Sequence, residues 1–176
     1  MLDIPKHLAN ELTCDADVGN KWAIPSCEGG NCLRSHVNKT ETLSALVMLT
    51  KAGVSSTKII VGIASYGRSF RMADSSCSGP MCKLLGDSRH SQAYPGTCTG
   101  TPGYIGNAEI NAIIKDHGSY SIVRTGTDLI ADSNVLMYGN PGAVDWVAYM
   151  DGSIKTNRVS WIKGLNLGGT TDWAIE

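Results

Sequence analysis

The sequence predicts an α/β fold in which parallel strands carry a binding site at their carboxyl ends. Two segments support this prediction, residues 58–70 and residues 168–176. The first is an apolar run that leads to Tyr66 and Arg68, and the second begins with two glycines and presents Trp173. Short apolar runs are typical of parallel strands that are buried on both faces. In a (β/α)8 barrel the active site lies at the carboxyl ends of such strands.

Length and charge narrow the class of protein. The chain has 176 residues, whereas a complete (β/α)8 barrel typically needs about 250, so we expect only part of a barrel. Its 15 basic and 16 acidic residues are well mixed and give a net charge of −1. That balance gives no indication of a nucleic-acid partner or an anionic membrane. No apolar run approaches the roughly 20 residues of a spanning helix, and no signal peptide is visible.

Cysteine usage and a glycosylation sequon predict a secreted protein. Five of the six cysteines lie in two loop-like stretches, and their gaps do not match the paired spacing of metal ligands. We therefore expect disulfides and no metal site, with the pairing left open. Asn38-Lys-Thr40 is an acceptor sequence for N-glycosylation. The candidate disulfide cysteines are Cys27, Cys32, Cys77, Cys82 and Cys98.

The first periodic element is a helix over residues 40–53. Its apolar side chains lie near one face, Asn38 or Thr40 can cap its start, and Gly53 ends it. A strand over residues 58–65 follows after a short loop. The apolar positions of the helix are Leu43, Leu46, Val47 and Leu49.

A mixed region follows these two elements. Residues 71–102 are rich in serine, glycine, cysteine and proline, and we expect loops there. Residues 107–116 predict a short helix that ends at Gly118 and turns its isoleucines inward. The segments between residues 120 and 138 predict short antiparallel strands.

The last part of the chain returns to α/β order. Residues 146–151 predict a strand, Ser153 is expected to cap a helix that runs to about Leu165, and residues 169–175 predict the final strand. Two tryptophans of this part are expected to be packing residues, Trp146 and Trp161.

Several sequence blocks follow one another in the order seen in family 18 chitinases. These are YGRSF at 66–70, GYIGNAE at 103–109, WVAYMD at 146–151 and GGTTDWA at 168–174. The cysteine-containing loops within residues 19–38 and 77–104 narrow the resemblance from the whole family to its fungal killer-toxin-like branch. Members of that branch are secreted and often carry chitin-binding modules elsewhere in the chain.

The resemblance implies a partial (β/α)8 TIM barrel with an α+β insertion domain. Residues 19–70 would supply a loop, a helix and strand seven, and residues 71–145 the insertion. Residues 146–176 would supply the final helix and strand eight. Residues 1–18 do not match the family, because its sixth-strand Met-x-Tyr-Asp motif is not there. The expected whole is the C-terminal part of a longer chitinase that is a monomer at full length.

The implied activity is hydrolysis of chitin, the β-1,4-linked polymer of N-acetylglucosamine, by endo-type cleavage. In this family the substrate's own N-acetyl carbonyl attacks the anomeric carbon while a glutamic acid protonates the leaving oxygen, with net retention. That acid closes an Asp-x-x-Asp-x-Asp-x-Glu motif, which the 176 residues do not contain. The chain is therefore expected to show no turnover alone.

Four residues match family positions that contact sugar. Trp173 would be the floor of the −1 subsite, Tyr66 and Arg68 would donate hydrogen bonds, and Glu109 would bind a −2 sugar. Three of them have a structural alternative: Trp173 as a core residue, Arg68 in a salt bridge to the insertion, and Glu109 favouring a helix dipole. His36 is interpreted as a loop hydrogen-bonder, since it lies in an Arg-Ser-His run.

Two alternatives to a chitinase remain open at this point, one of them a different function and the other a non-functional sequence. The same aromatic and hydrogen-bonding groups can serve a non-catalytic, lectin-like chitin-binding protein, and the unmatched residues 1–18 suggest a truncated gene model. The expected partner in either functional case is chitin or a chito-oligosaccharide. No cofactor, nucleic acid or membrane is expected.

Overall fold

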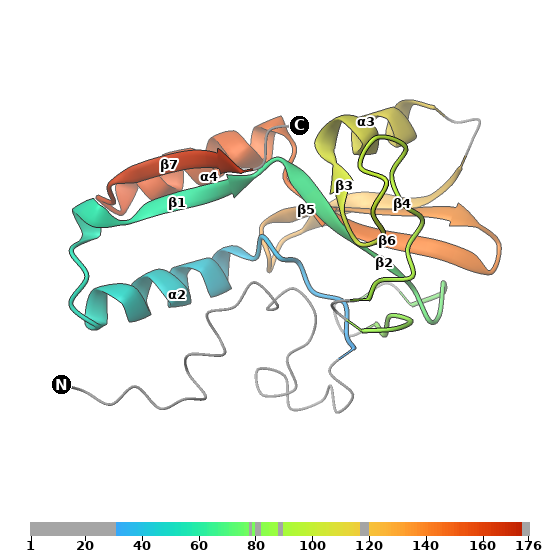
Figure 1. The fold of residues 1–176 in the computed structure, drawn as a ribbon, viewed down its shortest axis with the longest axis horizontal. Helices are drawn as coiled ribbons and strands as arrows, with labels where there is room; N and C mark the ends of the chain where they lie inside the picture. Colours follow the sequence, from blue (N-terminus) through green and yellow to red (C-terminus); the bar gives the residue numbers. More distant parts are fainter. Residues whose placement is uncertain (1–30, 78, 80–81, 88–89, 117–119, 174–176) are drawn as a thin grey trace.

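The computed structural model describes residues 31–77, 79, 82–87, 90–116 and 120–173, and it contains two sheets that lie side by side (Figure 1). Among these residues no helix is both long and apolar enough to span a membrane. The elements in chain order are α2 (Lys39–Lys51), η3 (Ser56–Lys58), β1 (Ile60–Ala64), β2 (Tyr66–Arg71), β3 (Ile105–Gly106), α3 (Asn107–Lys115), β4 (Ser121–Asp128), β5 (Ser133–Asn140), β6 (Ala143–Tyr149), α4 (Gly152–Gly164) and β7 (Gly169–Trp173).

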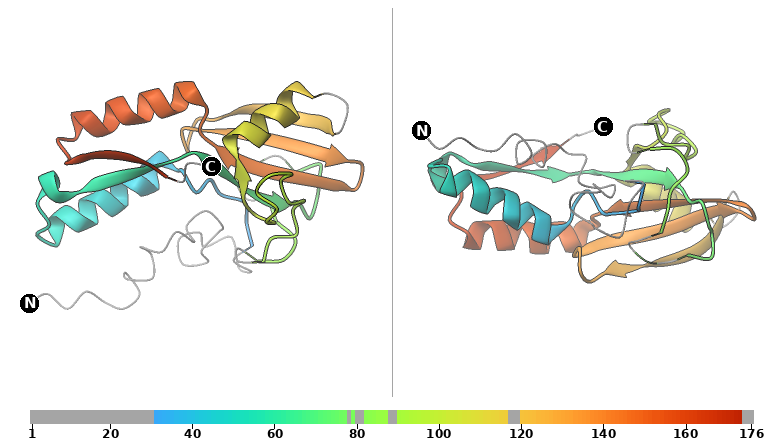
Figure 2. Two further views of the ribbon diagram at one scale, coloured as in Figure 1. Left: turned by 45° about the horizontal axis from the view of Figure 1, so that its top comes forward. Right: turned by 90° about the horizontal axis from the view of Figure 1, so that it is seen from below.

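The smaller sheet consists of β1 and β7, which run parallel in the register Ile60↔Gly169 to Ala64↔Trp173. Helices α2 and α4 run alongside these strands (Figure 2). Ile63 packs with Ile162 of α4 and with Met150 in a small core. Because side chains alternate along a strand, Ile60 points to the other side and is 56% exposed. The parallel pair therefore has one covered face in the described part of the chain.

The larger sheet is antiparallel, with the strand order β3-β2-β6-β5-β4. Alternate residues of its strands form two separate cores. One core lies against α3 and includes Ile110, Tyr138 and Val147. The other includes Phe70 and Trp146, together with loop residues from outside the sheet. Burial on both faces makes this sheet the main packed unit of the described chain.

The two sheets are joined at Ser65, where β1 passes into β2 almost without a break. The Ser65 amide donates to the carbonyl of Trp173 at 2.7 Å, and its carbonyl accepts from the Asn107 amide at 3.0 Å. Its hydroxyl accepts from Lys155 Nζ at 2.9 Å. Three elements, β7, α3 and α4, are thus fixed to one residue.

Most predicted elements are present. The expected helix at 40–53 is α2, and Asn38 is its cap, because Asn38 Oδ1 accepts from the Glu41 amide at 3.1 Å. Of its four predicted apolar positions only Leu46 is buried. The helix at 107–116 is α3, and its expected end at Gly118 lies outside the described residues. Trp146 is a packing residue, as predicted.

Two predictions need correction. The cap of α4 is Asp151 and not Ser153, because Asp151 Oδ1 accepts from the Ile154 amide at 2.8 Å. Tyr66 and Arg68 were expected to end the first parallel strand, but they open β2. The reason is that β2 pairs antiparallel with β3 and β6, so it belongs to the larger sheet.

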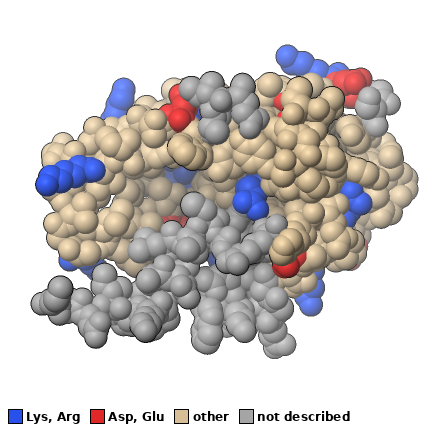
Figure 3. All heavy atoms as spheres, in the orientation of Figure 1, with Lys and Arg blue, Asp and Glu red and all other residues tan. Residues whose placement is uncertain are grey.

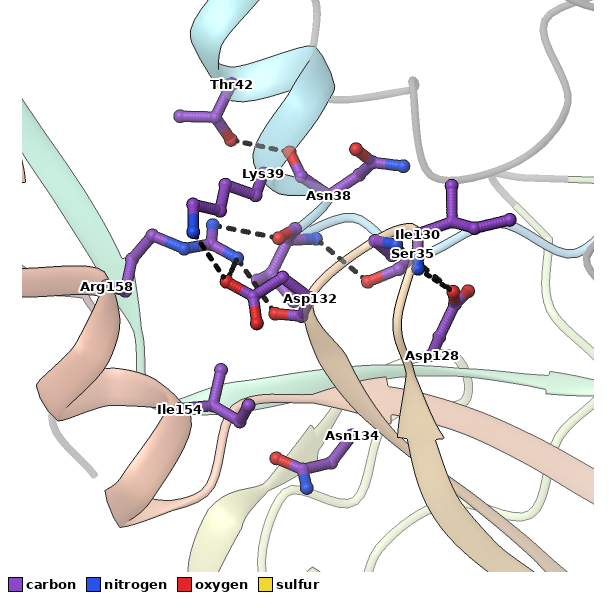
Figure 4. Close-up of polar contacts among 12 residues, drawn as sticks. Ser35, Asn38, Lys39, Thr42, Asp128, Ile130, Asp132, Asn134, Ile154 and Arg158 are labelled. Atoms are coloured by element: carbon purple, nitrogen blue, oxygen red, sulfur yellow. Dashed lines mark hydrogen bonds and ion pairs between the residues drawn. The ribbon is translucent and has the colours of Figure 1, made fainter. Parts of the chain in front are cut away.

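A buried arginine ties the two sheets together (Figure 4). Arg158 of α4 is only 3% exposed. It donates to the carbonyls of Val37 at 2.9 Å and Asp132 at 3.0 Å. Lys39 Nζ lies 3.1 Å from Asp132 Oδ2, and its amide donates to the Ala131 carbonyl at 2.9 Å. The start of α2, the β4–β5 turn and α4 are therefore fastened at one point.

Replacing Arg158 with methionine is expected to lower the free energy of unfolding by about 3 kcal/mol, because two buried carbonyls lose their donors. Urea titration of the purified chain measures this. Lys163→Met, an exposed change on the same helix, should stay within about 0.5 kcal/mol of the original. Equal effects of the two substitutions would contradict the role given to Arg158.

Candidate functional site

Three of the four predicted sugar-contacting residues line one cavity. Tyr66, Arg68 and Trp173 surround a space of about 330 Å³ at the carboxyl ends of β1 and β7. The described residues that line it include no carboxylate. On the described part of the face shown in Figure 3, charged side chains are scattered and form no large patch of one sign. The cavity offers donors and apolar surface, which suits a neutral ligand rich in acceptor oxygens.

Trp173 supplies an open aromatic surface. It is the last described residue of β7, pairs with Ala64, and is 64% exposed. Gly62 of the neighbouring strand lies beside it, and a Cβ at Gly62 would stand 3.9 Å from the Trp173 Cβ. The axial hydrogens of a sugar ring can pack against such an aromatic face while its hydroxyls stay hydrogen-bonded.

Tyr66 is held in a group of three rings. Its centroid lies 5.2 Å from that of His36 at an interplanar angle of 22°, and 4.5 Å from that of Tyr104 at 35°. Arg68 lies two residues further along β2, so it faces the same side as Tyr66. Its guanidinium carbon is 5.7 Å from the Phe70 ring centroid. Tyr66 and Arg68 thus bring a hydroxyl and a guanidinium to one wall.

The His36 ring stacks on Tyr66, and both of its nitrogens are buried without a hydrogen-bond partner among the described residues, so it does not have the predicted role of a loop hydrogen-bonder. The pKa of His36 is lowered to about 3, mainly by burial and then by the positive charge of Arg68, against a smaller opposing effect of the Tyr66 backbone. The imidazole is therefore neutral near pH 7. Sequence reasoning missed this role, since nothing local shows that the loop reaches β2.

Glu109 lies apart from the other three residues, in a second cavity of about 390 Å³. Its carboxylate accepts from the amides of Cys98 at 2.6 Å, Gly106 at 3.0 Å and Thr99 at 3.3 Å. Burial acts to raise its pKa, but these hydrogen bonds outweigh it and hold the pKa below the ordinary value. The contacts observed for Glu109 are those of a residue that fastens the 96–99 loop to the start of α3.

The cysteines divide into bonded and free. Cys77 and Cys82 form a disulfide, and Cys32 is disulfide-bonded as well. Cys27 lies outside the described residues. Cys98 is a free, exposed thiol and not the disulfide partner that was predicted. Within the described ranges no three potential metal-ligating side chains gather.

Comparison with protein families identifies the chain. The model of glycosyl hydrolases family 18 matches residues 23–176. The chain belongs to this family. The resemblance predicted from its sequence blocks is therefore confirmed, and the relatives below support the fungal killer-toxin-like branch.

Fungal relatives are similar over nearly the whole chain. "Probable chitinase LysM11" of Penicillium expansum is 52% identical over 174 residues, which cover 97% of this chain and 16% of the relative. "Secreted chitinase LysM12" of the same fungus is 49% identical and covers all of this chain and 12% of the relative. The killer toxin subunits alpha/beta of Kluyveromyces lactis are 30% identical over 83% of this chain and 11% of the toxin. The chain therefore spans a small part of these relatives' length.

Solved chitinases share the fold. A Group IV chitinase of Ostrinia furnacalis with allosamidin aligns with a TM-score of 0.60 and 25% identity, over 74% of this chain and 32% of that one. A GH18 chitinase of Cycas revoluta with (GlcNAc)4 aligns with a TM-score of 0.60 and 21% identity, over 82% of this chain and 37% of that one. The mixed α/β architecture is thus that of family 18 chitinases.

The low pKa of His36 makes stability depend on pH. In the unfolded chain the imidazole becomes protonated below about pH 6.5. In the folded chain it stays unprotonated down to about pH 3. The free energy of unfolding therefore falls as the pH drops through this window, by at most about 1.4 kcal/mol per pH unit from this residue. His36→Phe keeps the stack without titrating, so its stability should fall less steeply between pH 7 and 4 in urea titrations. Parallel curves for the two proteins would refute this.

Proposed function

We propose that the chain is the saccharide-holding side of a chitin-degrading glycoside hydrolase. The observation that carries the proposal is the convergence of Trp173, Tyr66 and Arg68 on one cavity at the ends of parallel strands. Family membership and relatives whose names describe chitinases support the substrate class.

The fold is proposed to be a sector of a (β/α)8 barrel with an α+β insertion. Strands β1 and β7 would be strands seven and eight, with α2 and α4 as their helices. Residues 71–145 would form the insertion, and β2 and β6 would be its connections to the barrel. The likeness to solved chitinases over about a third of their length supports this.

The proposed binding step combines aromatic stacking with hydrogen bonds to an uncharged sugar. An N-acetylglucosamine ring stacks on Trp173, and the Tyr66 hydroxyl and Arg68 guanidinium donate to its acceptor oxygens. The described residues around the cavity include no carboxylate, and the sequence holds no Asp-x-x-Asp-x-Asp-x-Glu motif. General acid catalysis contributes about 10²–10⁴-fold and needs an acid that gives up its proton to the leaving oxygen. The three residues supply no such acid, so their proposed role is to position the sugar. The same three side chains would also serve the second candidate, a lectin-like chitin-binding protein.

Glu109 is retained as a proposed ligand of a more distant sugar. Its carboxylate already holds three amides, so a sugar there would have to share these acceptor oxygens. We rank it below the other three residues for this reason.

Trp173→Ala is expected to weaken binding of (GlcNAc)4 by about tenfold, corresponding to about 1.4 kcal/mol of lost stacking. Isothermal titration calorimetry of the purified chain gives the dissociation constant. Leu129→Ala removes an exposed apolar side chain that lines neither cavity and should leave the constant within about twofold.

Absence of binding by the unchanged chain would reject the proposal. The same preparation should release no fluorophore from a chitotriose substrate above the buffer rate. Turnover there would show that another residue acts as the acid.

The secreted relative also supports glycosylation of Asn38 in an extracellular protein. Asn38 Oδ1 caps α2, while its Nδ2, the atom that carries a glycan, makes no hydrogen bond within the described residues. The cap and a glycan can therefore coexist on one side chain.

Secretion from a yeast host should yield a chain whose mass falls on treatment with peptide N-glycosidase F. Asn38→Asp keeps the capping oxygen and should abolish the mass change. Thr40→Ala should abolish it as well, whereas Thr40→Ser should preserve it. A mass unaffected by the enzyme in the unchanged chain would count against the site.

A further inference from the structure

Tyr66 has an aromatic neighbour on each side. His36 comes from the segment before α2, and Tyr104 from the segment before β3. Two rings stacked on the same face of Tyr66 would also meet each other, and in the described structure His36 and Tyr104 make no such ring contact. They therefore lie on opposite faces, and we call the three residues the Tyr66 sandwich.

The sandwich limits what Tyr66 can do in the cavity. A ring whose faces are covered cannot serve as a stacking platform for a sugar, which needs an open face. What Tyr66 presents is its edge, and the edge carries the hydroxyl. Trp173, at 64% exposed, is the ring with an open face. The two aromatic residues of the site thus have different tasks.

We propose that His36 and Tyr104 are positioning residues that hold the Tyr66 ring edge-on, so that its hydroxyl donates to a chito-oligosaccharide. The proposal rests on the proposed function of the cavity and adds two residues to it. Holding a side chain in place before binding removes the entropic cost of ordering it in the complex. Neither residue has to touch the sugar.

The composition of the sandwich suits this task. His36 is neutral at the pH of use because burial and the nearby Arg68 lower its pKa to about 3. An imidazolium would be repelled by Arg68, which lines the same cavity. On the other side, Gly103 has φ of +87°, a conformation that favours glycine, and it directs the chain that brings Tyr104 against Tyr66.

The test is a set of dissociation constants for (GlcNAc)4, measured by calorimetry on the 176-residue chain. Tyr66→Phe keeps the sandwich but removes the hydroxyl, and should weaken binding about fivefold. His36→Ala and Tyr104→Ala should each weaken it about threefold to fivefold. Combining either with Tyr66→Phe should add nothing, because both changes disable the same hydroxyl.

Conservative and matched variants separate positioning from general destabilisation. His36→Phe and Tyr104→Phe retain the stacked rings and should bind within about twofold of the unchanged chain. Leu46→Ala removes a buried side chain of α2 that lines neither cavity, and should lower the melting temperature without changing the constant. A ¹⁹F label on Tyr66 reports ring order without ligand, and its slow ring flipping should become fast in His36→Ala.

The outcomes are distinguishable. If the unchanged chain binds and Tyr66→Phe weakens it, but both alanine variants bind normally, the positioning role is overturned while the proposed function stands. Additive effects of His36→Ala and Tyr66→Phe, or unchanged ring flipping in the alanine variants, would overturn it as well. No binding by the unchanged chain overturns the proposed function and, with it, this inference.

Discussion

The site depends on the passage of one strand from a parallel sheet into an antiparallel sheet at Ser65. The amide of Ser65 holds the last described residue of β7, its carbonyl holds the start of α3, and its hydroxyl holds Lys155 of α4. Trp173 and Tyr66 are therefore placed relative to each other by backbone contacts, without a flexible loop between them. Sites on strands are more precisely built than sites on loops. Lys155 also pairs with Asp172 at 3.0 Å, which anchors β7 from the face opposite Trp173.

The electrostatics of the cavity follow from that placement. Arg68 and the buried Arg158 both line it, and no carboxylate does so among the described residues. Arg158 is already committed, since it donates to two backbone carbonyls. Arg68 in turn helps to keep His36 uncharged. The acetamido and hydroxyl oxygens of a neutral sugar need hydrogen-bond donors and no nearby carboxylate. The described lining of this cavity has that composition. A cationic ligand would find no carboxylate on the described walls.

The sequence predicted elements better than it predicted contacts. Helices α2 and α3 were found from apolar spacing, β1 from its apolar run and β7 from the two glycines that introduce it. Three of the proposed site residues converge in the structure, but Glu109 does not. At the third position of α3 its carboxylate is within reach of amides in a loop ten residues earlier, and local sequence does not reveal such tertiary partners. The same limit hid the burial of Arg158 and the stacking of His36 on Tyr66, whereas the cap at Asp151 is a local contact with the Ile154 amide and was misassigned to Ser153.

Stability and binding are carried by different parts of this chain. The five-stranded sheet has a packed core on each face, whereas β1 and β7 have a core on one face only. On their other face Ile60 and Trp173 are 56% and 64% exposed, and within the described residues β1 pairs with β7 alone. Exposed apolar side chains beside an unpaired strand edge favour association. The aromatic surface that suits a sugar thus lies on the exposed face of the parallel pair. The contacts through Ser65 and Arg158 help to attach this open pair of strands to the well-packed sheet, so loss of either set of contacts should disturb binding before it disturbs the larger core.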